Sequence, residues 1–202
     1  MAPDIVPARR ATRVALYGGS FNPPHVAHQM VALYVLETAP VDELWLMPAY
    51  EHALGKPLAP FADRLAMCQL AAAALGPRVI VSDIERTLGG PSRTLRTIRR
   101  LRELHPAHEF SLVIGADLLS EVATWFGGAE LQATVPFVVV GRAGTEGVAD
   151  HAVWPVKMPA VSSTEVRRSI AAGQPVEGLV PRAVLDYIYR QELYKGQGQE
   201  RV

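Results

Sequence analysis

Short runs of consecutive hydrophobic residues alternate along this chain with longer segments of helical periodicity. The runs are apolar at successive positions rather than at every second position, which is typical of strands buried on both faces. Several of them stop directly at a glycine or a proline, such as Gly18, Pro48 and Gly115. The pattern predicts strands at residues 13–17, 43–47, 79–81, 110–114 and 136–140, and a sixth candidate at 151–156.

The segments between these runs predict helices. Residues 61–75 form the clearest amphipathic one, with one apolar stripe through Phe61, Leu65, Cys68, Ala72 and Leu75. Ser92 is a plausible N-cap, Gly173 a natural residue after a helix end, and Pro181 fits a first helical position. The predicted helices span residues 25–38, 61–75, 92–104, 163–172 and 181–191.

Strands that alternate with helices predict an α/β fold, a Rossmann-like doubly wound, mainly parallel sheet with helices on both faces. We expect a single domain over residues 13–194, between a flexible N-terminal extension at 1–12 and a flexible tail at 195–202. Ligands of such sheets bind beyond the carboxyl ends of the strands. The site is therefore expected in the loops after Tyr17, Met47, Ile114 and Val140.

The composition of the chain limits the kinds of binding partner that we expect. The 20 Lys and Arg balance the 20 Asp and Glu, so the chain lacks the basic surplus that general nucleic-acid binding requires. No apolar run approaches the roughly 20 residues that span a bilayer, so no membrane association is expected. Cys68 is the single cysteine, which excludes an internal disulfide and favours a reducing cytoplasm. The oligomeric state stays open, with a homodimer as one option.

The first loop has the features of a phosphate site. Gly18, Gly19 and Ser20 follow a strand, and a helix starts near His25. Glycines allow positive φ and close approach of the main chain, and a helix N-terminus offers N–H groups to an anion. His25 and His28 lie three residues apart and can face the same ligand. A simple glycine turn with two surface histidines is the alternative, and a zinc site has no supporting Cys or second His pair.

The string GGSFNPPHVAH over residues 18–28 resembles the signature of the HxGH nucleotidyltransferase superfamily, with Ala27 in place of the usual glycine. This resemblance implies that Gly18, Gly19, Ser20 and Phe21 bind the phosphates of ATP. It also implies that His25 and His28 are catalytic, donating hydrogen bonds to phosphate oxygens as charge develops.

A second motif lies about 140 residues later, where Val161 to Arg167 precede a helix. By itself it predicts a helix capped by Ser162 or Ser163, with an exposed Arg167 as the plain alternative to an anion site. It resembles the I-S-S-T-x-[IV]-R motif of the same superfamily. The resemblance implies that Ser162, Ser163 and Thr164 bind phosphate and that Arg167 is catalytic.

Four further segments resemble nicotinate mononucleotide adenylyltransferases, so the similarity runs from about residue 13 to 194. Residues 114–119 resemble I-G-x-D and imply that Gly115 and Asp117 bind ATP. Residues 89–94 resemble G-x-S-Y-T, residues 123–126 resemble P-x-W-[YF], and residues 140–144 resemble R-x-G. Each has a plain alternative: Asp117 as a helix cap, Trp125 as core packing and Arg142 as an exposed turn residue.

The predicted acceptor site departs from that family at three places. Asn22 stands where Asp is usual, Arg93 replaces the usual Tyr, and the loop at 48–56 keeps a final basic residue, Lys56, but lacks the Pro-Pro-His element. Arg93, Arg96 and Arg100 share one helix face, which usually indicates a solvated face. The residues expected to bind the acceptor are Asn22, Lys56, Arg93, Thr94, Trp125 and Arg142.

The resemblance implies adenylyl transfer from ATP to nicotinate mononucleotide, a step of NAD biosynthesis that yields deamido-NAD and pyrophosphate. Mg²⁺ is expected to be carried mainly by the ATP phosphates, without a metal site of the protein's own. Alternatives are the same chemistry on nicotinamide mononucleotide or another phosphate acceptor, and a nucleotide-binding sensor without turnover. The loop at 51–60, with Gly55 and flanking prolines, could close as a lid.

Overall fold

Six parallel strands form the centre of the protein in a computed structural model, which describes residues 10–142 and 153–195. The strand order is β3-β2-β1-β4-β5-β6, and every neighbouring pair is parallel. The predicted parallel α/β sheet is therefore confirmed. The strands are β1 (Thr12–Gly19), β2 (Glu43–Pro48), β3 (Val79–Val81), β4 (His108–Gly115), β5 (Phe137–Arg142) and β6 (Val153–Met158).

Helices connect the strands and follow them at the C-terminal end. Three of these elements, α3, η1 and α5, were not predicted, because they are short and carry little periodicity. The helices are α1 (Val26–Thr38), α2 (Phe61–Ala73), α3 (Ile84–Leu88), α4 (Thr94–Leu104), the 3-10 helix η1 (Leu119–Thr124), α5 (Gly128–Thr134), α6 (Ser163–Ala171) and α7 (Arg182–Arg190).

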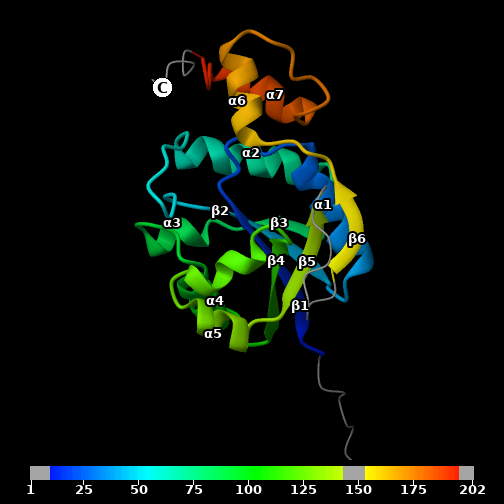
Figure 1. Cartoon of the computed structure of the whole chain (residues 1–202), viewed down its shortest axis with the longest axis vertical. Coiled ribbons are helices and arrows are strands. Elements are labelled where there is room, and N and C mark those ends of the chain that lie inside the picture. The colour runs from blue at the N-terminus through cyan, green and yellow to red at the C-terminus, as the bar shows by residue number, and fades with distance from the viewer. Residues whose placement is uncertain (1–9, 143–152, 196–202) are drawn as a thin grey trace, which may run out of the picture.

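Hydrophobic side chains cover both faces of the sheet, because successive residues of a strand point to opposite sides. Val14 and Leu16 of β1 pack in a cluster with residues of α4 and α5, such as Ile98 and Leu131. Ala15, between them, belongs to a second cluster with residues of α1 and α2. The prediction of helices on both faces is thus confirmed (Figure 1).

A third cluster joins the end of the chain to the sheet domain. Val166 of α6 and Val184 and Ile188 of α7 are fully buried, and they pack with Met67 and Ala71 of α2. Figure 1 shows α6 and α7 side by side at one end of the molecule, next to α2. The last helices therefore lie close to the carboxyl ends of the central strands.

Three local predictions need correction. The buried side of α2 is Arg64, Met67, Cys68, Ala71 and Ala72, so the predicted stripe is confirmed at Cys68 and Ala72, while Phe61 and Leu65 are only partly buried. Helix α4 begins at Thr94 with Arg93 as its N-cap, while the Ser92 hydroxyl accepts a hydrogen bond from the main-chain N–H of Tyr50. Pro181 is the N-cap of α7 rather than its first helical residue.

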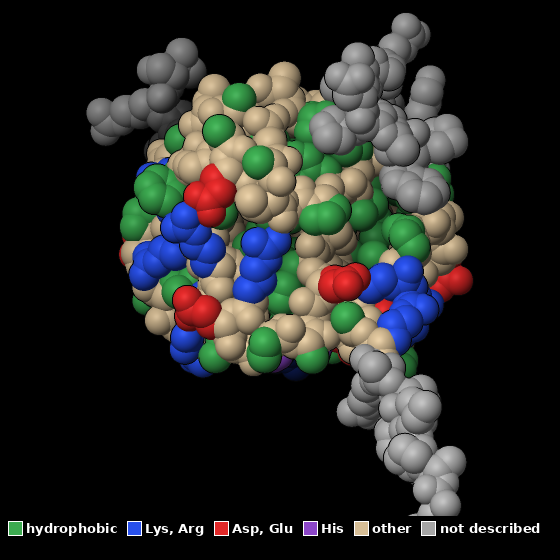
Figure 2. All heavy atoms as spheres, turned by 90° about the horizontal axis from the view of Figure 1, so that it is seen from below, with side chains coloured by type: hydrophobic (Ala, Val, Ile, Leu, Met, Phe, Trp, Pro, Cys, Tyr) green, Lys and Arg blue, Asp and Glu red, His purple; other side chains and the backbone are tan. Residues whose placement is uncertain are grey.

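The start of the described chain is tied to the sheet. β1 begins at Thr12, inside the extension predicted at 1–12, and the Arg10 guanidinium pairs with Asp42 at 3.1 Å. Residues 1–9 and 196–202 lie outside the described residues. On the face in Figure 2, Lys and Arg side chains stand beside Asp and Glu. Exposed ion pairs such as Arg99–Glu130 occur among the described residues.

None of the helices between residues 10 and 195 that the structure describes is long and apolar enough to cross a membrane.

Candidate active site

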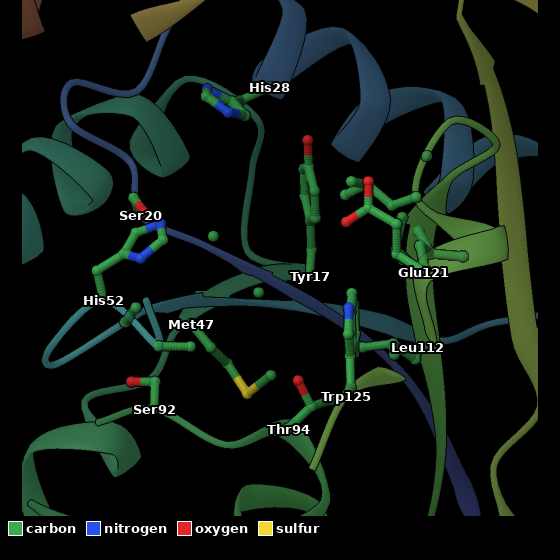
Figure 3. Close-up of a pocket in the computed structure, with 18 of the residues that line it drawn as sticks. Tyr17, Ser20, His28, Met47, His52, Ser92, Thr94, Leu112, Glu121 and Trp125 are labelled. Carbon is green, nitrogen blue, oxygen red and sulfur yellow. The ribbon is translucent and has the colours of Figure 1, made fainter. Parts of the chain in front are cut away.

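A cavity of about 640 Å³ opens at the carboxyl ends of β1, β2 and β4, the position expected for a ligand in this fold. Its volume suits a small molecule of nucleotide size. Figure 3 shows His28 at one end of the cavity and Ser92 and Thr94 at the other. Of the predicted site residues, it brings together Gly18, Gly19, Ser20, His25, His28, Lys56, Arg93, Thr94, Gly115, Asp117 and Trp125.

The glycine loop differs in detail from its prediction. Gly18 and Gly19 are part of β1, and the positive φ occurs at Phe21, at 45°. Gly19 is closely packed instead, because a β-carbon there would lie 3.2 Å from the Phe21 ring and the ring would have to shift slightly. That ring is buried, with 1% of its surface exposed, and it packs in the core. Phe21 can therefore reach a phosphate through its main chain only.

The two histidines form one unit at the start of α1. The main-chain N–H of His25, the N-cap, donates to Nδ1 of His28 at 3.0 Å. Their rings stack with centroids 3.7 Å apart. A neutral His28 whose Nδ1 accepts a hydrogen bond carries its proton on Nε2. The arrangement thus prepares an N–H donor on the ring that borders the cavity (Figure 3).

Tyr17 lies between the two ends of the cavity and was not predicted as a site residue. Its ring contacts those of Phe21 and His28, at centroid distances of 5.7 and 6.0 Å. Figure 3 shows its side chain rising toward His28 from the end of β1. Sequence reasoning counted Tyr17 as part of a buried strand. Its place as the last residue before Gly18 was the signal that could have identified it.

The start of α6 meets the first loop. Ser162 is the N-cap, with its hydroxyl accepting from the N–H of Glu165, so the first of the two predicted caps is confirmed. Ser163 Oγ donates to the carbonyl oxygen of Pro23 at 2.8 Å. Arg167 Nη1 donates to the carbonyl oxygen of Asn22, also at 2.8 Å. The two sequence motifs are therefore in direct contact, although Ser162, Ser163, Thr164 and Arg167 do not line the cavity.

The Asn22 side chain faces the interior. It is 3% exposed, and its Oδ1 accepts from the Ala59 N–H at 3.1 Å and from the Tyr194 hydroxyl at 2.9 Å. Asn22 does not line the cavity. The predicted contact between the Asn22 side chain and the acceptor has no support in this geometry. Motif spacing placed the residue in the loop but gave no information on the direction of its amide.

The far end of the cavity is built by the loop before α4. Gly89 and Gly90 adopt φ of 64° and 68°, a region that favours glycine. The Arg96 guanidinium holds this loop by donating to the carbonyl oxygens of Leu88, at 2.6 Å, and Gly89, at 3.1 Å. Arg93 turns toward the cavity instead. The predicted solvated face thus fits Arg96 and Arg100, which are exposed, and excludes Arg93.

Trp125 packs against the core and also borders the cavity. It is partly buried against the core cluster of α4 and α5, and it also lines the cavity. Figure 3 shows it across the cavity from Met47 and His52. Arg142 ends β5, but its side chain lies outside the described part of the structure.

Three further ionisable residues line the cavity without having been predicted. Glu85 of α3 is 7% exposed and accepts a hydrogen bond from the Thr97 hydroxyl, and Glu121 belongs to η1. Burial, followed by the nearby Lys56 ammonium, lowers the pKa of His52 below its usual value. Sequence reasoning missed Glu85 and Glu121 because both lie on short helices that it did not predict.

Over the described residues, no three His, Cys, Asp or Glu side chains are grouped closely enough to hold a metal ion.

Comparisons with known proteins all point to the same family. Residues 16–169 match the family model described as cytidylyltransferase-like. The chain is 48% identical to a probable nicotinate-nucleotide adenylyltransferase of Anaeromyxobacter dehalogenans, over 91% of this chain and 97% of that protein. It is 39% identical to a protein of the same description from Myxococcus xanthus, over 92% and 96%.

A solved structure shares the fold. Plasmodium falciparum nicotinic acid mononucleotide adenylyltransferase, complexed with NaAD, superposes with a TM-score of 0.79 over 91% of this chain and 97% of that chain. The two sequences are 21% identical, so this likeness concerns the fold alone.

Proposed function

Because the chain belongs to the cytidylyltransferase-like family, and within it to the nicotinate-nucleotide adenylyltransferases, we propose that it transfers the adenylyl group of ATP to nicotinate mononucleotide. The products are deamido-NAD and pyrophosphate. The observation that carries this proposal is one continuous cavity, with the His25–His28 pair at one end and the Ser92–Thr94 loop and Trp125 at the other. Its two ends offer separate contacts, one to the phosphates of ATP and the other to the acceptor.

The reaction is a direct displacement. An oxygen of the acceptor 5′-phosphate attacks the α-phosphorus of ATP, the bond from that phosphorus to the bridging oxygen breaks, and pyrophosphate leaves with the electron pair. The acceptor oxygen is already anionic, so no strong base is required. Catalysis then consists of positioning and of stabilising charge on the phosphates. Cys68 takes no part, because it is buried in α2.

The phosphate end supplies donors. His28 Nε2–H and His25 are the proposed catalytic donors to oxygens of the α-phosphate, and the main chain of Gly18 to Phe21 lies beside them at the N-terminus of α1. Gly115 and Asp117, at the end of β4, are the proposed partners of the ATP nucleoside.

Helix α6 provides the second set of proposed phosphate contacts. Ser162, Ser163, Thr164 and Arg167 hold the β- and γ-phosphates in this proposal. The hydrogen bonds from Ser163 and Arg167 to the first loop already place the helix N-terminus against it. The Arg167 guanidinium donates to the Asn22 carbonyl and to Thr164 Oγ1, and with five N–H groups it keeps other donors for a phosphate.

The acceptor end carries positive charge and an aromatic ring. Trp125 is proposed to stack on the pyridine ring, and Arg93, Thr94 and Lys56 to receive the acceptor's carboxylate and phosphate. Arg142 stays a predicted acceptor contact. Mg²⁺ is proposed to enter with ATP, coordinated by phosphate oxygens and water, because this ion keeps several of its waters.

Release of pyrophosphate from ATP tests this function. Wild-type protein is mixed with MgATP and, separately, with nicotinate mononucleotide, nicotinamide mononucleotide, 4′-phosphopantetheine or no acceptor. We expect release with nicotinate mononucleotide well above the other mixtures. Preferential release with another acceptor would change the substrate and keep the chemistry. Tight ATP binding without release in any mixture would identify a sensor and refute the proposal.

A further inference from the structure

Arg64 is the largest fully buried side chain of the described structure, with 1% of its surface exposed. It lies on the buried side of α2, where an amphipathic helix ordinarily carries apolar residues. Burial lowers the pKa of its guanidinium, which nevertheless stays charged in proteins. No carboxylate in the described ranges pairs with it. A buried cation without a carboxylate requires other partners.

Those partners are four main-chain carbonyl oxygens from three segments. Nη1 donates to Ser20 at 3.0 Å and to Ala49 at 2.6 Å. Nη2 donates to Tyr50 at 2.9 Å, and Nε donates to Ala59 at 2.9 Å. Ser20 belongs to the phosphate loop after β1, and Ala49 and Tyr50 belong to the loop after β2. One guanidinium therefore fastens the two loops that follow neighbouring strands.

The geometry of the peptide bond extends this effect to the cavity. In a trans peptide unit the carbonyl and the next residue's N–H point in opposite directions. With the Ser20 carbonyl held on Arg64, the N–H of Phe21 is directed away from it. With the Ala49 carbonyl held on Arg64, the N–H of Tyr50 is likewise directed away, and it donates to Ser92 Oγ at 2.9 Å.

This second bond reaches the acceptor end. Ser92 lines the cavity, directly before Arg93 and Thr94, and its own N–H donates to the carbonyl of Glu51 at 3.1 Å. A chain of hydrogen bonds therefore runs from Ser20, through Arg64 and the peptide between Ala49 and Tyr50, to Ser92. It spans the distance between the two ends of the cavity that Figure 3 shows.

We propose that Arg64 is a positioning residue for adenylyl transfer, one that fixes the phosphate loop after β1 relative to the loop after β2 and, through Ser92, relative to the acceptor end of the cavity. This inference rests on the proposed function. Arg64 does not line the cavity in which both substrates are proposed to bind, so its effect is on alignment. Misplacement of reacting groups by about 1 Å can lower turnover about 100-fold, whereas the affinity for each substrate depends mainly on its own end of the cavity.

Arg64→Lys and Arg64→Gln test the proposal. Lysine keeps the charge but loses the planar fork, and glutamine loses both. We expect Arg64→Lys to fold, as far-UV circular dichroism will measure, and to lower kcat about 100-fold with KM for ATP changed less than about threefold. Hydrogen exchange at residues 20–22 and 49–52 is expected to become faster.

Arg78→Lys is the matched control. The Arg78 guanidinium also donates to main-chain carbonyls, those of Leu36, Val41 and Asp42, but it lies away from the cavity. This variant is expected to lower the melting temperature and to leave kcat within about twofold of wild type.

A double-mutant cycle tests whether Arg64 acts through the hydrogen bond from the Tyr50 N–H to Ser92. Ser92→Ala removes the acceptor of the Tyr50 N–H. If Arg64 acts through this bond, Ser92→Ala lowers kcat by a smaller factor in the Arg64→Lys background than in wild type. Equal factors in the two backgrounds would refute the path.

Three other results would overturn the positioning role. They are a kcat of Arg64→Lys within about twofold of wild type, a loss of kcat equal to the loss of folded protein, and failure of both Arg64 variants to fold while Arg78→Lys folds. If wild-type protein releases no pyrophosphate, the proposed function fails instead. The hydrogen-exchange comparison then still tests whether Arg64 fixes the two loops.

Discussion

The hydroxyl of Tyr194 donates a 2.9 Å hydrogen bond to Oδ1 of Asn22, across 172 positions of the chain. Both residues are buried, at 4% and 3% exposure. Tyr194 follows α7, while Asn22 lies in the loop that carries the phosphate site. The end of the described chain therefore holds this loop on its interior side. It does so at Asn22, whose Oδ1 also accepts a hydrogen bond from the Ala59 N–H.

Tyr194→Phe should destabilise the protein by about 1 kcal/mol, because one buried hydrogen bond is lost while Asn22 keeps its second donor. For a chain of this length, that corresponds to a fall in melting temperature of roughly 2–4 °C. Calorimetry measures it. Tyr189→Phe, at an exposed position of α7, serves as the control. Equal melting temperatures of Tyr194→Phe and wild type would contradict the role of this bond.

The burial of Tyr194 is also expected to make the stability of the fold depend on pH. Burial raises the pKa of the Tyr194 hydroxyl above its usual value of roughly 10, against the smaller opposite effects of Arg167 and Arg64. As the pH rises through 10, the unfolded chain releases this proton and the folded chain keeps it, so the free energy of unfolding decreases. Urea unfolding at mildly and strongly alkaline pH should show a smaller decrease in Tyr194→Phe than in wild type.

His28→Asn separates the catalytic and structural roles of His28. The asparagine Oδ1 can replace Nδ1 as acceptor for the His25 N–H, but no donor replaces Nε2–H. We expect kcat to fall about 10²–10³-fold with little change in melting temperature, as for the loss of one transition-state donor. Pyrophosphate release under saturating substrates is the measurement. His105→Asn, beside Trp45 and outside the cavity lining, should keep wild-type turnover. Near-normal turnover of His28→Asn would remove His28 from the mechanism.

Arg93→Gln tests acceptor selection. A guanidinium in the cavity favours a carboxylate over a neutral amide, and a charged hydrogen bond contributes about 1.5–3 kcal/mol. The ratio of kcat/KM for nicotinate mononucleotide to that for nicotinamide mononucleotide should fall at least about tenfold. Arg100→Gln, whose side chain pairs with Glu103 on the same helix, should leave the ratio unchanged. An unchanged ratio in Arg93→Gln would mean that other groups hold the carboxylate.

Cys68 should resist thiol reagents in the folded protein. Its side chain is fully buried, and burial raises the pKa of the thiol, so very little reactive thiolate forms near neutral pH. Labelling by a chromogenic disulfide is expected to be slow in buffer and to accelerate through the urea unfolding transition. Rapid labelling of the native protein would show that α2 opens locally.

The order of strands and main helices was predictable because each leaves a local mark. Residues 14–17 are hydrophobic and are followed by Gly18, and residues 163–172 follow a capping serine. The five-residue helix α3 leaves no such mark, since one turn has no measurable period, so Glu85 escaped notice. Its placement depends on contacts with α4, including the Thr97 hydroxyl.

Side-chain direction was the harder part of the site. Motif spacing identified the loop that holds both Asn22 and His25, but it could not show that the Asn22 amide faces the interior. Sequence reasoning did not single out Arg64, because its burial depends on carbonyls from three segments that fold around it. Non-local partners of this kind are outside the reach of periodicity.

The hydrogen bonds of Arg64 all go to main-chain carbonyl oxygens, so they do not depend on which side chains those residues carry. Every amino acid brings the same oxygen, so substitutions at Ser20, Ala49 or Tyr50 need not disturb the attachment to Arg64. The loop at 48–56, which departs from the family pattern, can therefore differ in its side chains while its main chain keeps these contacts. In this enzyme family, such an anchor would let acceptor preference evolve without rebuilding the phosphate site.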